Sequence, residues 1–436
     1  MDELQTRLEE LRDRGLYRRM RLISGPQGPR VLLDGKPVLL LCSNNYLGLA
    51  DHPRVREAAA DAAMRYGVGA GASRLISGNM TIHRRLEEEL AAFHQARACL
   101  AFGSGYLANA GIVSALAGEG DVVFSDRLNH ASIVDGCRLA RARTFVYDHA
   151  DTDQLEWGLR EADGRGALIV TDGLFSMDGD VAPLERIVEL AGRYDARVMV
   201  DDAHAVGTIG PGGRGAVAAA GLEHEVDIVV GTLGKSLGSY GAYACCDKEM
   251  AKYLVNTART LIFSTALPPP AVAGALAALE LLVDNPRRAE RLQDNARVLR
   301  AALAEEGLST GSSETHILPL LIGDAEDTMD ASEQALARGI FAQGIRPPTV
   351  PAGQSRLRLS VMATHSQTEL RAAARSLAAV VPEALPRTVP VRASKGELSE
   401  PSALGAEAVK RAKPADDWLE PEPEAAKPFD YLADAA

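Results

Sequence analysis

The sequence predicts an α/β protein with a mostly parallel sheet in a large domain, followed by a small α+β domain. Short apolar, β-branched runs recur between residues 98 and 246, and each ends abruptly in polar, ionisable or glycine residues. Such runs are typical of strands that are buried on both faces. Helical segments separate most of them, and this alternation favours right-handed crossovers between parallel strands. Beyond residue 280, long helical stretches and further strand patterns indicate the second domain.

The domain boundaries follow from these changes of pattern. We expect an N-terminal helix and hairpin at 1–48, the large domain at 49–280, the small domain at 281–385 and a tail at 386–436. The tail is rich in proline, glutamate, alanine and lysine and poor in apolar residues, so it is predicted to be largely disordered. The tail contains three aromatic residues that either form a docking motif or, more simply, have no shared function: Trp418, Phe429 and Tyr431.

Local signals place the individual elements. Residues 1 to about 20 have helical periodicity, and residues 31–42 resemble a hairpin that turns on Asp34 and Gly35. Three leucines share the apolar face of the first helix: Leu4, Leu8 and Leu11. The glycine-rich residues 67–78 predict a loop where the backbone approaches a ligand or another subunit. Strands are expected at 99–102, 122–126, 144–147, 168–172, 198–201, 227–232, 242–246, 316–322 and 356–361, and helices at 81–94, 107–116, 131–142, 271–306 with a break at 284–286, and 331–337.

Composition excludes several classes of protein. A net charge of −12 argues against a nucleic-acid binder, because neutralising phosphates requires basic patches. No apolar run is long enough to span a membrane. The five cysteines show no CxxC spacing, which favours reduced thiols over a disulfide framework or a zinc site. The sequence therefore predicts a soluble cytoplasmic enzyme without a metal site.

Ionisable side chains follow two of the predicted strands, at the edge where α/β sheets bind their ligands. One strand delivers Asp201, Asp202 and His204, and the next delivers Thr232 and Lys235 among glycines. A desolvated lysine has a lowered pKa and forms Schiff bases, so an aspartate and a lysine at this edge suggest pyridoxal 5'-phosphate. The plainer alternatives are a surface lysine, a helix-capping or ion-paired Asp201, and a hydrogen-bonded core histidine at position 204.

Three further features have both a functional and a plain interpretation. The Gly-Ser-Gly-Tyr sequence at 103–106 lies between a strand and a helix, where backbone N–H groups can bind an anion, although most such turns hold no ligand. His130 is either a residue at a helix N-terminus or a flat ring that stacks on a cofactor. Arg356 and Arg358 share one face of a strand, where they are either solvated or aimed at a carboxylate.

Taken in order, these motifs resemble those of the α-oxoamine synthases, which are fold-type-I enzymes that use pyridoxal phosphate. The resemblance covers residues 10 to 384 and implies a seven-stranded, mostly parallel sheet in the large domain. It excludes the tail after residue 385. The matching segments are Ser-Asn-Asn-Tyr-Leu-Gly at 43–48, the glycine-rich loop at 67–78, Gly-Ser-Gly-Tyr at 103–106, Asn-His-Ala-Ser at 129–132, Asp-Gly-Leu-Phe-Ser-Met-Asp-Gly-Asp at 172–180, Val-Asp-Asp-Ala-His at 200–204, Thr-Leu-Gly-Lys at 232–235 and Ser-Thr-Ala-Leu-Pro at 264–268.

The resemblance implies a role for each matching residue. Lys235 would hold the cofactor covalently, Asp201 would pair with its pyridine nitrogen, and His130 would stack on its ring. His204 and Ser176 would contact the side of the phenolic oxygen. The phosphate would be bound by the Gly105 and Tyr106 backbone and by Thr232, with Ser264 or Thr265 contributed by the partner subunit of a homodimer. Asn44 and Arg358 would bind the carboxylate of the amino acid.

Within this family, residues 345–351 are most similar to those of the 8-amino-7-oxononanoate synthases, a biotin-pathway subfamily. That subfamily joins L-alanine to a pimeloyl thioester, carried by coenzyme A or a carrier protein, in a decarboxylative condensation. Arg346, Thr349 and an N-terminal arginine, best aligned with Arg18, would then contact substrate. The alternatives are another α-oxoamine synthase that uses glycine or serine, such as a glycine C-acetyltransferase or a serine palmitoyltransferase-like enzyme, and a non-catalytic partner subunit, which the presence of Lys235 disfavours. A dinucleotide-dependent oxidoreductase would need a Rossmann fingerprint, which this sequence lacks.

Overall fold

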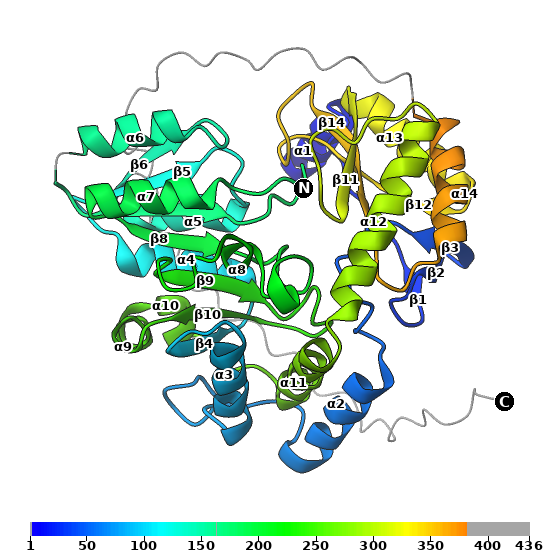
Figure 1. The fold of residues 1–436 in the computed structure, drawn as a ribbon. Coiled ribbons are helices and arrows are strands. Elements are labelled where there is room, and N and C mark those ends of the chain that lie inside the picture. Colours follow the sequence, from blue (N-terminus) through cyan, green and yellow to red (C-terminus); the bar gives the residue numbers. More distant parts are fainter. Residues whose placement is uncertain (1, 163, 382–436) are drawn as a thin grey trace. The chain divides into compact units, whose positions relative to one another are not determined.

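The largest of the described sheets has seven strands (Figure 1). The structure is a computed structural model that describes residues 2–162 and 164–381. The strand order is β4-β10-β9-β8-β7-β5-β6, and β10 is antiparallel to both of its neighbours, whereas β9, β8, β7, β5 and β6 are parallel. The strands are β4 (Ala98–Phe102), β5 (Val122–Asp126), β6 (Arg143–Tyr147), β7 (Ala167–Asp172), β8 (Arg197–Asp201), β9 (Ile228–Thr232) and β10 (Ala242–Cys246). The predicted fold class, including this mostly parallel sheet, is confirmed.

Helices cover both faces of this sheet, which explains why its strands are largely apolar. Every residue of β5, β7 and β10 is buried. Successive side chains point to opposite faces, so Val123 packs in one hydrophobic cluster with α4 and α5, whereas Phe124 packs in the other with α6 and α7. The helices are α2 (Pro53–Tyr66), α3 (Thr81–Phe93), α4 (Gly105–Leu116), α5 (Ala131–Ala140), α6 (Thr152–Glu161), α7 (Leu184–Tyr194), α8 (Ala216–Ala220), α9 (Lys248–Thr257), α10 (Arg259–Ile262) and α11 (Pro269–Asp284), with the 3-10 turn η1 (Pro211–Gly213).

A second, antiparallel sheet lies in the region predicted as the small domain. Its order is β11-β14-β13, with β11 (Ile317–Gly323), β13 (Gln343–Ile345) and β14 (Ser355–Ser360). Helices α12 (Arg287–Glu305), α13 (Ala325–Ala337) and α14 (Gln367–Ala378) accompany it. The break between α11 and α12 falls at residues 285–286, within the predicted interruption. The domain boundaries themselves stay a prediction, and residues 386–436, with their three aromatic residues, lie outside the described residues.

The N-terminal hairpin joins this second region through a pairing that is distant in sequence. Strands β1 (Ile23–Ser24), β2 (Arg30–Leu33) and β3 (Lys36–Leu40) form a meander that turns on Asp34 and Gly35, as predicted. The short strand β12 (Ile340–Phe341) then pairs in parallel with β3. This pairing fixes the segment just before the hairpin close to α13, where one of the cavities described below lies.

The first helix is shorter than predicted. Helix α1 (Asp2–Asp13) ends because Gly15 adopts a left-handed conformation, with φ of 63°. Leu4, Leu8 and Leu11 do share a helix face but are 67%, 40% and 37% exposed. Their face is therefore not covered by the described residues. Helix α13 begins six residues earlier than residue 331, because the Asp324 side chain accepts hydrogen bonds from the first turn. Of the described helices, none combines the length and the apolar character needed to cross a membrane.

Candidate active site

Carboxylates collect where the parallel strands end. Asp126, Asp172 and Asp201 are the last residues of β5, β7 and β8, and Thr232 is the last residue of β9. All three carboxylates are buried. Because the carboxyl ends of parallel strands lie at one edge, the sheet brings these groups together at the place predicted from Asp201 and Lys235 alone. The same rule could have identified Asp126 and Asp172, whose significance sequence reasoning missed.

Hydrogen bonds hold the Asp201 carboxylate, which forms no salt bridge with any residue in the described part of the chain. Its Oδ2 accepts from Asn109 Nδ2 at 2.6 Å, and its Oδ1 accepts from the Ala203 backbone N–H at 3.0 Å. Burial, and then the negative charge of Asp201, raise the pKa of Asp172 well above its ordinary value. The protein thus places a hydrogen-bonded, buried Asp201 beside a carboxyl group that resists ionisation.

Lys235 follows β9 and its side chain is half-buried. Desolvation lowers the pKa of its amine to about 8, assisted by the charge of Arg358 and opposed by Asp201 and Asp172. Its Nζ forms no hydrogen bond or salt bridge with any of the residues that the structure describes. A lysine with a lowered pKa and an uncommitted amine is suited to forming a Schiff base with an aldehyde, and the alternative of a surface lysine does not apply.

A buried tyrosine connects the predicted carboxylate-binding pair to His204. The Tyr46 hydroxyl donates to Asn44 Oδ1 at 2.9 Å, accepts from Arg358 at 3.2 Å and lies 2.7 Å from His204 Nδ1. Burial, together with the charges of Lys235 and Arg358, lowers the pKa of His204 well below its ordinary value. His204 is therefore neutral, and Tyr46 is a member of the site that the motif at 43–48 contained but that was not assigned a role.

The two arginines of β14 are both buried, so the solvated alternative is wrong for this strand. Arg358 donates to the Ser176 carbonyl at 2.5 Å and to Asn44 Oδ1 at 3.3 Å. Arg356 pairs with Asp178 at 2.5 Å. Both contacts hold the loop that follows β7, so this loop presents Ser176 on the side of the site that faces the second sheet.

Two of the predicted phosphate-binding residues, Gly105 and Tyr106, begin helix α4. Gly105 is the first residue of this helix, and a Cβ added there would meet no atom within 4 Å, which leaves open space before the helix N-terminus. Ser104 caps the helix through the Leu107 N–H. Tyr106 is exposed and donates to Asp135, and Thr232 donates to the Gly241 carbonyl.

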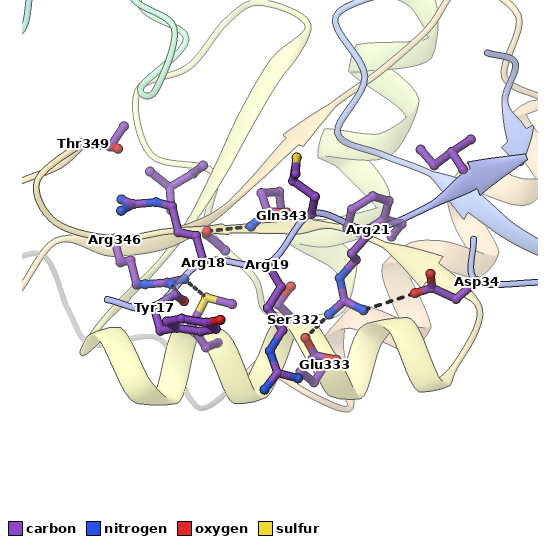
Figure 2. A pocket seen from close by; sticks show the side chains of 16 residues that line it. Tyr17, Arg18, Arg19, Arg21, Asp34, Ser332, Glu333, Gln343, Arg346 and Thr349 are labelled. Atoms are coloured by element: carbon purple, nitrogen blue, oxygen red, sulfur yellow. Dashed lines mark hydrogen bonds and ion pairs between the residues drawn. The ribbon is translucent and has the colours of Figure 1, made fainter. Parts of the chain in front are cut away.

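His130 and the residues predicted to contact substrate line two cavities that share Thr349. One cavity, of about 850 Å³, is lined by His130, Ser176 and Arg356 as well as Thr349. The other, of about 830 Å³, is lined by Tyr17, Arg18, Arg346 and Thr349 (Figure 2). Arg18 therefore lies with Arg346 and Thr349, although more than 300 residues separate it from them in sequence, and Thr349 connects this cavity to the His130 side.

Arg346 is buried beside an exposed arginine. Its Nη2 donates to the Tyr17 carbonyl at 2.7 Å, and its Nε is buried without a partner. Desolvation, and then the charge of Arg18, lower the pKa of Arg346. Two guanidinium groups that repel one another at a cavity wall favour an anionic ligand.

Ser264 and Thr265 lie between α10 and α11. Ser264 is half-buried, Thr265 is exposed, and Thr265 pairs with Ser73 of the glycine-rich loop in an isolated antiparallel bridge. Their contribution to the site of a partner subunit stays a prediction.

This donor set fits pyridoxal phosphate. An uncommitted amine of lowered pKa suits the aldehyde, a buried carboxylate suits the ring nitrogen, and an open helix N-terminus suits the phosphate. The His130 ring is exposed at the cavity, where it is free to stack on a planar ligand. Burial and the charge of Lys235 lower the pKa of His130, against the effect of Asp201, so the ring is neutral.

A histidine that sequence reasoning missed fixes the loop carrying Ser176. His149 bonds to Asp126 at 3.1 Å and to Asp180 at 2.7 Å, and it packs edge-on against Phe175. Desolvation lowers the pKa of His149. The hydrogen bonds and charges of Asp126 and Asp180 outweigh this effect and raise the pKa of His149 to about 10. The His149 cation thereby joins the end of β5 to the loop after β7.

The His149→Gln variant is expected to be less stable in a manner that depends on pH. Because the folded pKa lies above the ordinary value, the stabilisation is complete below about pH 6.5 and is lost as the pH rises towards 10. We expect the free energy of unfolding to fall by about 2 kcal/mol at pH 6 and by much less at pH 10. Urea unfolding at both pH values measures this, with the exposed His224→Gln as control. Equal losses at both pH values would contradict the role of the charge.

Comparisons with known proteins agree with this geometry. The family model for aminotransferase class I and II matches residues 36–377. An 8-amino-7-oxononanoate synthase from Citrifermentans bemidjiense is 54% identical over 378 residues, covering 86% of this chain and 97% of that protein. One from Geobacter sulfurreducens is 53% identical over 377 residues, covering 86% of this chain and 96% of that protein.

Solved structures show the same fold. A structure of SPT with PLP has a TM-score of 0.82 and 32% identity, covering 87% of this chain and 96% of that chain. The 8-amino-7-oxononanoate synthase from Francisella tularensis has a TM-score of 0.69 and 27% identity, covering 78% of this chain and 97% of that chain. The chain is an enzyme that depends on pyridoxal phosphate, and it belongs to the aminotransferase class I and II family, within the α-oxoamine synthases.

Proposed function

We propose that the enzyme condenses L-alanine with a pimeloyl thioester to give 8-amino-7-oxononanoate, a step of biotin biosynthesis. The observation that carries this proposal is the amine of Lys235, whose pKa is lowered by burial and which is influenced by the charge of the buried Asp201. His130, which the charges of both residues influence, lines the cavity that shares Thr349 with the cavity of Arg18 and Arg346. Relatives more than 50% identical over most of the chain are 8-amino-7-oxononanoate synthases, which supports the choice of substrates.

The atoms of this reaction balance without an oxidant or reductant. The Cα–H bond of alanine breaks first, and a carbon–carbon bond then forms between the alanine Cα and the thioester carbonyl carbon. The carbon–sulfur bond breaks to release the thiol, which leaves with one proton in place of the one taken from Cα. The bond from Cα to the alanine carboxylate breaks to release carbon dioxide. A proton then replaces it on Cα, which gives the aminoketone.

The residues of the chain divide this work among them. Asn44 and Arg358 bind the alanine carboxylate, and the Lys235 amine, with its pKa of about 8, removes the Cα proton. Asp201 holds a proton at the ring nitrogen of the cofactor. Pyridoxal phosphate, when bound, supplies the electron-accepting ring that this proton abstraction requires.

The cavity of Figure 2 is suited to the acyl thioester, because its arginines face a space large enough for an extended anionic ligand. Arg21 lines the same cavity but is engaged by Glu333 and lies 3.9 Å from Asp34. Arg18 and Arg346 have no carboxylate partner among the residues that the structure describes. We assign these two arginines, with Thr349, to acyl-substrate binding.

Removing Arg346 is expected to weaken acyl-substrate binding alone. The Arg346→Ala variant should raise KM for pimeloyl-CoA by roughly 10- to 100-fold, because a charge-assisted contact is lost, and leave KM for L-alanine unchanged. Steady-state kinetics with each substrate varied in turn measures both constants. Arg21→Ala is the matched control and should change KM far less. An equal rise in KM for L-alanine would show that Arg346 serves the amino-acid site instead.

The substrates themselves are tested by supplying single amino acids. L-Alanine with pimeloyl-CoA or a pimeloyl carrier protein should yield 8-amino-7-oxononanoate by mass spectrometry, and glycine or L-serine should yield little product. The likeness to SPT structures makes L-serine with palmitoyl-CoA the informative competitor. Efficient use of serine and failure with alanine would overturn the assignment. The homodimer with a shared site and the cytoplasmic location remain predictions, the former to be checked by light scattering.

A further inference from the structure

Two residues outside the predicted site connect Asp201 to His130. Asn109, in the interior of α4, and Ser132, in the first turn of α5, are both fully buried. Asn109 Nδ2 lies 2.6 Å from Asp201 Oδ2 and 2.9 Å from Ser132 Oγ. Ser132 Oγ in turn lies 2.7 Å from His130 Nδ1. A continuous series of hydrogen bonds therefore runs from the strand-end carboxylate to the histidine that lines the cavity.

The donors and acceptors fix the direction of every bond in this series. The amide nitrogen of Asn109 has two N–H groups. It donates one to Asp201 and the other to Ser132. Ser132 Oγ thus accepts from Asn109, so its own proton is available to His130 Nδ1. The Ser132 backbone N–H also points to that nitrogen, at 3.3 Å. His130 Nδ1 is consequently an acceptor, and the proton of the neutral ring is on Nε2.

The orientation of the Asn109 amide follows from the same contacts. Reversing the amide would place its oxygen against Asp201 Oδ2, where two acceptors would meet. In the observed orientation, Asn109 Oδ1 is buried without a partner. An unpaired buried carbonyl oxygen is unfavourable. The two hydrogen bonds that Asn109 donates must therefore stabilise the fold by more than the free energy that the unpaired oxygen costs.

We propose that Asn109 and Ser132 are positioning residues of the cofactor site: Asn109 orients the Asp201 carboxylate and, through Ser132, holds His130 as its Nε2-protonated tautomer. Neither residue was predicted to contact cofactor or substrate. This role rests on the proposed function, because that function assigns Asp201 and His130 to the cofactor. The His130 tautomer, however, is set in the protein before the cofactor binds.

The test measures the His130 tautomer and cofactor affinity separately. In the full-length, cofactor-free protein, ¹⁵N NMR of the histidine rings, assigned with His130→Gln, should show the Nε2-protonated form. Ser132→Ala should shift His130 to a mixture of tautomers, and Asn109→Leu should do the same. We expect the dissociation constant for pyridoxal phosphate, measured by fluorescence quenching, to rise about tenfold in Asn109→Leu.

Two further variants separate this role from a general loss of packing. Ser132→Thr keeps the hydroxyl and should retain the tautomer. Ser125→Ala removes another buried hydroxyl near the strand ends, one that accepts from Asn129, and should leave His130 unchanged. Ser132→Ala loses a single oxygen atom, so it keeps the test valid if Asn109→Leu does not fold.

An unchanged His130 tautomer in Ser132→Ala, or an unchanged cofactor affinity in Asn109→Leu, would overturn the proposal. If instead the wild-type protein bound no pyridoxal phosphate, the cofactor assignment would fail. The NMR result would still decide whether the series of hydrogen bonds from Asp201 fixes the His130 tautomer. The two failures are therefore distinguishable.

Discussion

The Lys235→Ala variant is expected to lose both covalent attachment of the cofactor and nearly all activity. Lys235 is the amine with a pKa lowered to about 8 beside Asp201 and Asp172, and the other residues named at the site offer no primary amine to replace it. Removing a group that serves as both nucleophile and base should cost about 10⁴-fold or more in kcat. Borohydride reduction followed by peptide mapping should find the cofactor on residue 235 in the wild type only.

A surface lysine provides the control for this experiment. Lys252 on α9 is exposed and pairs with Glu249, so Lys252→Ala should retain both the label and the activity. The label on a different lysine, or full activity in Lys235→Ala, would contradict the assignment. Exchange of the alanine Cα proton with deuterium oxide, followed by NMR without acyl substrate, tests the base function directly and should also be lost in Lys235→Ala.

The Asp201→Asn variant should fold normally but lose the ability to activate the amino acid. The substitution keeps the shape of the side chain and removes the negative charge that would face the ring nitrogen of the cofactor. Loss of one partner from a buried charged pair costs about 3–5 kcal/mol, which corresponds to a fall of about 10²- to 10⁴-fold in the exchange of the alanine Cα proton. Asp201→Ala should lose this exchange as well.

The neighbouring carboxylate is the matched control. Asp202 is also fully buried, and desolvation raises its pKa to about 7, but its Oδ2 accepts from the Val217 N–H. Asp202→Asn should therefore retain proton exchange at a rate near that of the wild type. Wild-type exchange in Asp201→Asn, with the cofactor still bound, would show that residue 201 does not serve the ring nitrogen.

The sequence by itself determined the central sheet and its ligand-binding edge. Strands buried on both faces require continuous apolar runs, and the polar residues that end those runs must emerge at one edge. Asp201 and Lys235 could be selected for this reason, and the hairpin turn at Asp34 and Gly35 could be selected from turn chemistry. The specific roles of His130, Ser176 and Arg346 came from the resemblance to a family and not from local patterns.

Only the tertiary structure decided which distant side chains meet. Asn109 occupies an ordinary interior position of α4, and nothing in its sequence neighbourhood indicates a bond to Asp201. His149 and Tyr46 likewise acquire their partners from other segments. Local periodicity reports which face of an element is buried, but hydrogen-bond partners depend on how strands and helices far apart in the chain are packed. The local sequence thus determines which residues lie at the ligand-binding edge of the sheet. The hydrogen bonds that orient those residues form only when distant segments pack together.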